Sequence, residues 1–583
     1  MIQRIPKLAA AAVGLATLLG PAAGWAGPAE TFGIPGPSQP SLKPARLTPS
    51  EAAGLDLGRV PEVRLQALDA DALLREDAAV QRQGRAKGLR YGVGRDLLLA
   101  AGDGHRYDLA GGGRLWVGEI VSTGALGLRL HFRDVRLPAG AELAIYSVDA
   151  SDPASGVFRN GDPRFDPDRN VEFHDGAPAR RGDFWTGTFF DERVRVEFLM
   201  PVAPAGAAAS GELPFTVDRL QHLYLDPVAE LAKRSGQAVG SCENDVTCHP
   251  EWADVARAVA GIGVVNRDAL FCTGQLLDDQ AEDLTPYWLT AHHCVSSAGA
   301  AQSAEIYWLY QTATCGGVPP ALRGVPHSVG ATLLATSQAS DFSLLMVEGA
   351  LPAGLFWAGW TSQAVADGTT AAAIHHPRGD YKRISFGFKD AVAACKSLSP
   401  NHSLVRVSWT DGPTETGSSG SGIFRSDTHQ LFGQLYDGPS ACGRETYDCF
   451  GAFTTTYPAI ESFLQAGSDD DSEPNDTCAQ ARTVRRGTLP NRIVKIGSPD
   501  WYAIRVPAGK TVTVRLAFSN AQGDIDLAGF RSCSGDPAVI SAGSSDGEVI
   551  SLANPGGQAA FVYWRVYLDS DTRNDYDMTV SVR

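Results

Sequence analysis

The sequence predicts an all-β protein, built from several β-rich units in one chain. Three observations carry this prediction. The chain has 583 residues, which is more than a single hydrophobic core usually holds. Short runs alternate apolar and polar residues with a period of two, as strands with one buried face do. Glycine, proline, asparagine and aspartate separate these runs, as they do where turns join strands.

The composition limits the classes of partner. Hydrophobic residues make up 44% and charged residues 20% of the chain, as in ordinary soluble globular proteins. The formal net charge of -16 gives no basic surface for nucleic acid or anionic lipid. Downstream of the N-terminus, no run is long and apolar enough to span a bilayer. We therefore expect no nucleic-acid partner, no membrane span, and a monomer.

The N-terminus has the pattern of a secretory signal. Arg4 and Lys7 supply a positive region, residues 8–19 supply an apolar region, and Ala26 is a small residue at a suitable cleavage point. The alternative is a buried N-terminal helix. The pattern favours a signal peptide over residues 1–26 and a secreted protein.

Cysteine placement divides the rest of the chain. All 10 cysteines lie between Cys242 and Cys533, and an even number in an exported protein predicts disulfides. Residues 27–233 have none, although they carry strand-like runs at 128–132 and 194–198. We interpret 27–233 as a β-rich prosegment that ends at a polar cleavage site, residues 233–236.

Two further units follow. Residues 234–466 hold eight cysteines and many short strand-like runs, as expected for a pair of β-barrels. Residues 467–476 form an acidic linker. Residues 477–583 alternate again and predict a small β-sandwich, in which Cys478 and Cys533 can pair.

Three side chains in the middle unit have the residue types and chain order of an acyl-transfer site. His293 follows a strand-like run, Asp341 begins an apolar run, and Ser419 lies in the glycine-rich turn 417–421. Acyl transfer needs a nucleophile, a base, a carboxylate that orients the base, and donors to the oxyanion. We assign these roles to Ser419, His293, Asp341 and the N–H groups of Gly417 and Ser419. A glycine-serine linker or a structural histidine explains each motif alone but not the three together.

These motifs resemble those of the chymotrypsin-like serine proteases, and more closely the secreted bacterial lysyl endopeptidases. The resemblance covers roughly residues 238–466 and includes runs at 240–242, 356–360, 374–377, 382–385 and 433–435. It implies a chymotrypsin-like double β-barrel that acts on protein or peptide substrates. It also implies His293, Asp341 and Ser419 as the triad, so that the adjacent His292 is not the base.

The resemblance implies three disulfides as well. They are Cys242–Cys442, Cys248–Cys315 and Cys272–Cys294, the last beside the base. Cys395 and Cys449 are then left over in this unit and pair by elimination.

The resemblance also points to lysine as the preferred residue before the cut. Pro413 stands where trypsin-like enzymes have their pocket acid, whereas Asp448 matches the pocket aspartate of the lysyl endopeptidases. A single buried carboxylate suits a compact ammonium better than a guanidinium. Glu415 is a competing candidate, and a solvated loop aspartate is the alternative for Asp448. The resemblance places Trp409 beside His293, with Tyr436 where the family has a stacking histidine.

One departure bears on activation. Chymotrypsin pairs a new N-terminal amine with an aspartate before the nucleophile, but here that residue is Ser418. No such switch is expected. We therefore expect the protein's own prosegment to keep the protease inactive in the precursor, either by covering the cleft or by directing folding.

Other motifs carry less weight. Neighbouring histidines at 292–293 and 375–376 suit zinc poorly, because neighbours on a strand face opposite sides, and we expect no catalytic metal. Residues 378–380 are expected to be a turn.

The C-terminal unit resembles the pre-peptidase C-terminal domain of secreted bacterial proteases at 473–476, 500–502 and 574–577. Its turn 523–526 is a candidate calcium site, with ordinary surface acids as the alternative.

Two functional alternatives stay open at this point. The chain can be a secreted binding or adhesion protein on a protease scaffold, or a serine protease with another preference than lysine. The presence of all three triad residues disfavours the first alternative.

Overall fold

The computed structural model describes residues 29–37, 47–82, 89–110, 112–138, 140–147, 156–159, 182–200, 212–225, 242–266, 268–348, 351–391, 395, 401–465, 470, 472, 475–496, 498–533, 537–569 and 573–583. The predicted signal peptide, the predicted cleavage site and most of the predicted linker lie outside these residues.

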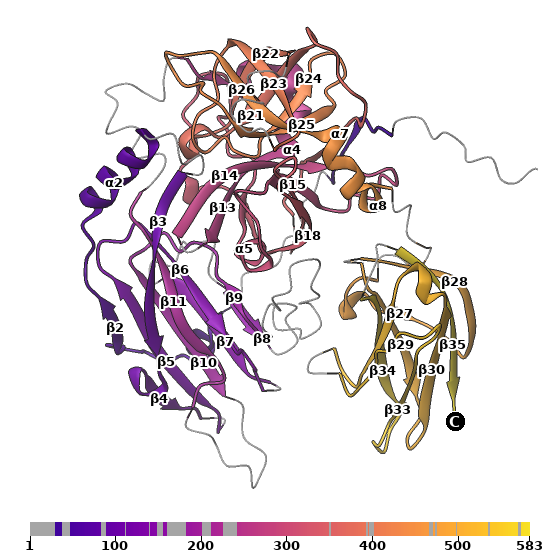
Figure 1. Ribbon diagram of the computed structural model, residues 1–583. Helices are drawn as coiled ribbons and strands as arrows, with labels where there is room; N and C mark the ends of the chain where they lie inside the picture. The colour runs from indigo at the N-terminus through magenta and orange to yellow at the C-terminus, as the bar shows by residue number, and fades with distance from the viewer. Residues whose placement is uncertain are drawn as a thin grey trace, which may run out of the picture.

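The part upstream of Cys242 packs two sheets around one apolar core (Figure 1). One sheet has the order β2 (Glu62–Leu65), β5 (Arg114–Ser122), β10 (Arg193–Met200), β7 (Glu142–Ser147), β8 (Gly156–Arg159), with β4 (His105–Asp108) beside β5. The other sheet contains β3 (Leu89–Leu99), β11 (Thr216–Leu223), β6 (Gly127–Arg133) and β9 (Phe184–Trp185). Two helices, α1 (Pro49–Ala52) and α2 (Ala70–Arg82), precede β3. The runs expected at 128–132 and 194–198 are the strands β6 and β10.

The first half of the middle unit curls around a second core. Its strands follow the order β17 (His327–Val329), β16 (Glu305–Tyr307), β13 (Val259–Asn266), β14 (Asp268–Leu277), β15 (Tyr287–Ala291), β19 (Phe342–Val347), β18 (Ala331–Ser337). The helices α4 (Ala253–Ala258) and α5 (Ala298–Gln302) pack against these strands.

The second half forms a closed barrel. Its order is β22 (Arg383–Asp390), β21 (Thr370–His375), β24 (Gly422–Arg425), β25 (Leu431–Asp437), β26 (Tyr447–Ala452), β23 (Leu404–Asp411), and pairing of β22 with β23 completes the ring. The short strand β12 (Asn244–Asp245) adds to β22, and α7 (Phe453–Thr456) and α8 (Glu461–Leu464) follow β26. The chymotrypsin-like double β-barrel is therefore confirmed.

Strands from upstream extend the first barrel. β3 pairs with β14, and β1 (Gly33–Pro35) pairs with β20 (Phe356–Ala358). A contact between two fully buried side chains spans the same boundary, because Nε of the upstream Arg129 lies 3.7 Å from Oε2 of Glu305 in the first barrel. Arg129 Nη2 also donates to Ser303 O at 2.5 Å. The predicted prosegment thus shares a sheet with the first barrel (Figure 1).

The C-terminal part is the expected β-sandwich. A five-stranded sheet has the order β27 (Arg482–Thr483), β29 (Asp500–Val506), β34 (Ala560–Leu568), β31 (Ile525–Phe530), β32 (Val539–Ser541). A four-stranded sheet has the order β28 (Gly487–Lys495), β35 (Arg573–Val582), β30 (Thr511–Phe518), β33 (Val549–Ala553). Across the part of the chain that the structure describes, no helix has the length and apolar character needed to cross a membrane.

Five disulfides form, and they are the expected pairs. They join Cys242–Cys442, Cys248–Cys315, Cys272–Cys294, Cys395–Cys449 and Cys478–Cys533.

Candidate active site

His293 and Asp341 meet because their strands are neighbours. Ala291, at the end of β15, lies opposite Phe342, at the start of β19, so the residues just beyond each strand end face one another. His293 Nδ1 lies 2.7 Å from Asp341 Oδ2, and His293 N donates to Asp341 Oδ1 at 3.0 Å. Asp341 adopts a left-handed φ of 54°, a conformation that costs energy for an aspartate and marks a constrained position.

This geometry determines which ring nitrogen of His293 can act. A carboxylate oxygen accepts only, so His293 Nδ1 carries a proton, and in the neutral ring Nε2 keeps its lone pair. Nε2 is buried, and no hydrogen-bond partner for it is found among the described residues. The neighbouring His292 directs its Nδ1 to Thr336 Oγ1 at 2.7 Å instead. His293 thus offers a basic nitrogen that is ready to take a proton.

The turn that carries Ser419 depends on two glycines. Gly417 and Gly420 have φ values of +94° and +83°. A Cβ on Gly417 would lie 2.9 Å from His376 O, and one on Gly420 would lie 2.4 Å from Thr273 O. Both positions therefore exclude larger residues on steric grounds as well as on backbone conformation.

Thr273 of β14 fixes the same turn to the first barrel. Its N–H donates to Ser419 O at 2.8 Å, and its hydroxyl donates to Gly417 O at 3.0 Å. The adjacent Cys272 is bonded to Cys294, which follows His293 directly. A short covalent route therefore connects the strand that holds the serine turn to the turn that holds the histidine.

A second set of hydrogen bonds shapes the turn from the other side. Burial, and then the charge of Arg383, lower the pKa of His375 to about 3, so its ring is neutral. Glu415 N–H donates to Ser418 Oγ at 3.2 Å. The only hydroxyl proton of Ser385 goes to Pro413 O, so the neutral His375 ring carries its proton on Nε2, and the Ser418 hydroxyl donates to His375 Nδ1 at 2.8 Å. His375 Nε2–H then donates to Ser385 Oγ at 2.9 Å, and Ser385 donates to Pro413 O at 2.7 Å.

Sequence reasoning missed this role of His375, because it weighed the pair 375–376 only as metal ligands. The available signal was the serine that replaces the usual aspartate before the nucleophile, since such a group needs a new partner when buried. Ser418 and His375 are both fully buried, so their hydrogen bonds are made away from water.

Asp448 lies where three segments of the second barrel converge. It sits on β26 and is only 1% exposed. Its Oδ2 accepts from Trp409 Nε1 and Thr414 Oγ1, both at 2.7 Å, and its Oδ1 accepts from Ser440 N at 3.2 Å. These three donors are neutral, and they orient the carboxylate.

Glu415, the competing acid, has a cationic neighbour. Arg378 Nη2 donates to Glu415 Oε1 at 2.7 Å. Arg378 adopts a left-handed φ of 55° within the turn 377–379, which agrees with the turn expected there. The charge of Glu415 is therefore already balanced by its own chain.

The two aromatic residues have separate neighbours. Trp409 is bonded to Asp448 and packs edge-to-face with Phe450, with ring centroids 6.1 Å apart. Tyr436 lies edge-on to His293 at 6.2 Å and stacks on His402 at 4.7 Å. Tyr436 thus borders the histidine, whereas Trp409 supports the carboxylate.

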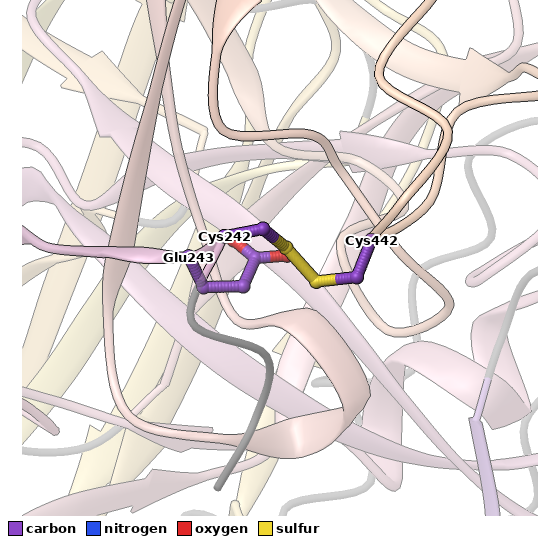
Figure 2. A group of neighbouring side chains, drawn as sticks. All are labelled: Cys242, Glu243 and Cys442. Carbon is purple, nitrogen blue, oxygen red and sulfur yellow. A yellow bond between two sulfur atoms is a disulfide. The ribbon is translucent and has the colours of Figure 1, made fainter. Parts of the chain in front are cut away.

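The described residues contain one group of potential metal ligands. The one group of three potential ligands there is Cys242, Glu243 and Cys442, and Figure 2 shows that its two sulfur atoms form a disulfide. The candidate calcium turn begins β31, where burial and the charges of Asp569, Asp524 and Glu548 raise the pKa of Asp526 to about 7. Calcium binding there stays a prediction.

Part of the chain is similar to known proteins. Residues 236–451 match the family described as "Lysyl endopeptidase, C-terminal domain". The lysyl endopeptidase of Pseudomonas aeruginosa PAO1 is 29% identical over 298 residues, which cover 48% of this chain. The chain spans 63% of the length of that relative.

Solved structures are similar at a lower level. The scabies mite inactivated protease paralogue S-I1 is 14% identical with a TM-score of 0.28, covering 38% of this chain and 96% of its own. The active form of the Rv3671c protease from M. tuberculosis is 14% identical with a TM-score of 0.26, covering 38% and 87%. Such scores add nothing to the fold assignment, which rests on the strand order.

The family match ends within β26, at Gly451, and includes each residue of the hydrogen-bonded arrangement just described. Residues 236–451 are therefore similar to the C-terminal domain of lysyl endopeptidases.

Proposed function

We propose that the chain is a secreted serine endopeptidase that cuts peptide bonds after lysine. The observation that carries the proposal is the pair of contacts between His293 and Asp341, which uses both carboxylate oxygens and leaves Nε2 basic. The clamp of Thr273 on the carbonyls of Gly417 and Ser419 supports it, because it fixes the serine turn to the strand whose Cys272 is bonded to Cys294, the residue after His293.

The reaction would follow the usual acyl-enzyme course. Ser419 Oγ attacks the scissile carbonyl carbon, and His293 Nε2 takes the hydroxyl proton. The carbonyl oxygen becomes an oxyanion, which the N–H groups of Gly417 and Ser419 stabilise. When the C–N bond breaks, His293 returns the proton to the leaving amine. Water then attacks the ester with His293 again as base, which releases the second product and restores Ser419.

Asp448 supplies the preference for lysine in this proposal. Its carboxylate is buried and is oriented by three neutral donors. Two of them, Thr414 and Ser440, come from the segments before and after the serine turn. A substrate ammonium would pair with this carboxylate in a site of low dielectric, where ion pairing is strong. Glu415 is less suited, because Arg378 already neutralises it.

Secretion and maturation complete the proposal. Residues 1–26 would direct export, 27–233 would be the prosegment, 234–466 the protease, and 477–583 a pre-peptidase-like C-terminal domain after the linker 467–476. Five disulfides suit an oxidising compartment. The precursor should be cut near Lys233 or Arg234. N-terminal sequencing of the mature protein checks this, and a start far from residues 234–242 contradicts it.

Covalent labelling tests the nucleophile. A serine-directed phosphonate should label the mature wild-type protein, and Ser419→Ala should lose the label and about a millionfold in kcat, as triad knockouts do. Ser421→Ala is the matched control and should keep most activity. Loss of label in Ser421→Ala with turnover in Ser419→Ala would reassign the nucleophile. Absence of label from the wild type would favour a non-catalytic binding protein.

A further inference from the structure

A segment near the N-terminus lies along the connection between the two barrels. We call residues 29–37, which include β1, the strap. The connection, residues 351–369, follows β19 of the first barrel and precedes β21 of the second. It contacts both barrels, because Ala358 pairs with β14 and Gly359 O accepts the N–H of Leu431 of β25 at 2.9 Å. The strap therefore binds where the two barrels meet.

Backbone hydrogen bonds hold most of the strap. β1 is antiparallel to β20, and further bonds extend this pairing at both ends. Thr31 N–H donates to Trp360 O at 3.0 Å, and Gly36 N–H donates to Leu355 O at 2.9 Å. Bonds between backbones depend little on side chains, so the same edge of β20 can pair with other extended chains.

Two side chains outside the strap also bind its backbone. Gln430 is 1% exposed, and its Nε2 donates to Thr31 O at 3.0 Å. Ser362 donates to Ala29 O twice, from its N–H at 3.1 Å and from its hydroxyl at 2.9 Å. Both acceptors are main-chain oxygens, so these donors also recognise an extended backbone and not a particular side chain.

Two glycines three residues apart decide which chains fit this edge. Gly33 has a φ of +83°, and a Cβ there would lie 2.6 Å from Trp357 O. A Cβ on Gly36 would lie 2.4 Å from the ring of Trp357. That ring is held in place, since Trp357 is 3% exposed and its Nε1 donates to Thr285 O at 2.9 Å. The edge therefore requires the spacing Gly-x-x-Gly.

The other positions of the strap are less restricted. Phe32, before the first glycine, is 66% exposed. Ile34, after that glycine, packs against the core of the first barrel. The only ionisable side chain of the strap is Glu30, which is exposed. A chain that suits the edge is thus extended, almost uncharged, and apolar after its first glycine.

We propose that the edge of β20 is a second substrate-binding site of the mature protease, and that it binds unfolded segments with glycine at every third position. The strap fills this site in the precursor. The inference rests on the proposed function, because only the maturation cut separates the strap from the protease. An unpaired sheet edge is a template for another extended chain. Denatured collagen belongs to the substrate class, since glycine occupies every third position of its chain.

Binding of a strap peptide tests the site directly. The mature wild-type enzyme is titrated with a fluorescent peptide of residues 29–37, which contains no lysine and so survives the proposed activity. We expect saturable binding that is about tenfold weaker for the Gly33→Val peptide, because valine resists a positive φ and meets Trp357 O. The Phe32→Ala peptide is the matched control and should bind like the native peptide.

Three results of this titration would overturn the inference. They are no binding, equal binding of the native and Gly33→Val peptides, and a prosegment fragment that stays on the mature enzyme and blocks the peptide.

Cleavage of gelatin, which is denatured collagen, tests the use of the site. Excess strap peptide should slow the cutting of gelatin and leave hydrolysis of a small lysyl ester unchanged, whereas the Gly33→Val peptide should slow neither. Gln430→Leu removes the donor to Thr31 O and should raise KM for gelatin about fivefold, with normal ester hydrolysis. Gln363→Leu, at an exposed glutamine of the same connection, is the matched control and should behave like the wild type.

Ester hydrolysis separates the two proposals. Normal ester hydrolysis with gelatin cleavage that neither the strap peptide nor Gln430→Leu affects would refute the second site alone. A wild-type enzyme that cannot hydrolyse the lysyl ester would refute the proposed function and this inference together.

Discussion

Replacing Asp448 by asparagine isolates the charge proposed to select lysine. The two side chains have nearly the same shape, and an amide oxygen can still accept from Trp409 Nε1 and Thr414 Oγ1 at the positions now 2.7 Å from Oδ2. The NH2 group would face Ser440 N, now 3.2 Å from Oδ1, and this lost hydrogen bond is the main structural side effect. The substitution therefore removes a negative charge and disturbs the fold little.

The magnitude follows from the burial of that charge. Asp448 is 1% exposed, so a bound lysine ammonium would lose its hydration and would depend on the carboxylate for compensation. Leaving one partner of a buried ion pair alone costs about 3–5 kcal/mol. Each factor of ten corresponds to about 1.4 kcal/mol, so kcat/KM for lysyl substrates should fall by roughly two to three and a half powers of ten.

Matched peptides with lysine, arginine or norleucine before the cut provide the assay. Norleucine has the apolar stem of lysine without its charge, so Asp448→Asn should leave kcat/KM for norleucine nearly unchanged while that for lysine falls. Labelling by a small phosphonate should also be unchanged. Glu415→Gln is the control and should keep the lysine preference, because Arg378 already pairs with Glu415. Equal lysine preference in Asp448→Asn and wild type, or its loss in Glu415→Gln, would refute the reasoning.

Two further predictions address the support of the site and the response to pH. His375→Phe leaves the Ser418 hydroxyl without its acceptor and should lower kcat about 100-fold by misplacing the serine turn, with KM little changed. His375→Gln should restore part of the lost kcat. Equal kcat in the wild type and both variants would contradict a positioning role for His375. Burial and the charges of two neighbouring acids raise the pKa of Asp278 to about 7, so its contribution to stability is full below its ordinary pKa near 4 and is lost as the pH rises through 7. Asp278→Asn, measured by thermal unfolding in a Ser419→Ala background, should therefore raise Tm by about 2–4 °C at pH 8 and change it little at pH 4. Asp283→Asn is the opposite control, because the bond to Lys495 lowers the pKa of Asp283, and a stabilising Asp283→Asn at pH 8 would show the sign to be wrong.

The sequence could predict what depends on local pattern. Strand periodicity located β6 and β10, and the spacing of glycine and serine located the turn 417–421, because these signals lie within a few consecutive residues. The disulfides followed from a resemblance whose motifs include the cysteines themselves. The fold class was also within reach, since alternating runs and turn residues persist over most of the chain.

Pairings between distant segments were not within reach. Nothing local tells that β3 adds to β14, some 180 residues later in the chain, because the alternation within a strand indicates a buried face but not the partner strand. The neutralisation of Glu415 depends on Arg378 in a left-handed conformation, which residue type alone does not predict. The bond from Trp409 to Asp448 likewise requires the register of β23 on β26, which places Val407 opposite Asp448.

The hydrogen bonds around Ser418 bear on how the precursor differs from the mature protein. Ser418 is held by His375, and Ser419 O and Gly417 O by Thr273, while the upstream strands are still attached to the first barrel. None of these partners comes from the residues next to the expected maturation cut. A new N-terminal amine is therefore not needed to shape this turn, unlike in an enzyme whose turn waits for that amine. The upstream strand β3 pairs with β14 at Ala269–Phe271, and β14 holds Ser419 O at Thr273, so the strand that supports the serine turn is also the one to which the upstream part is attached.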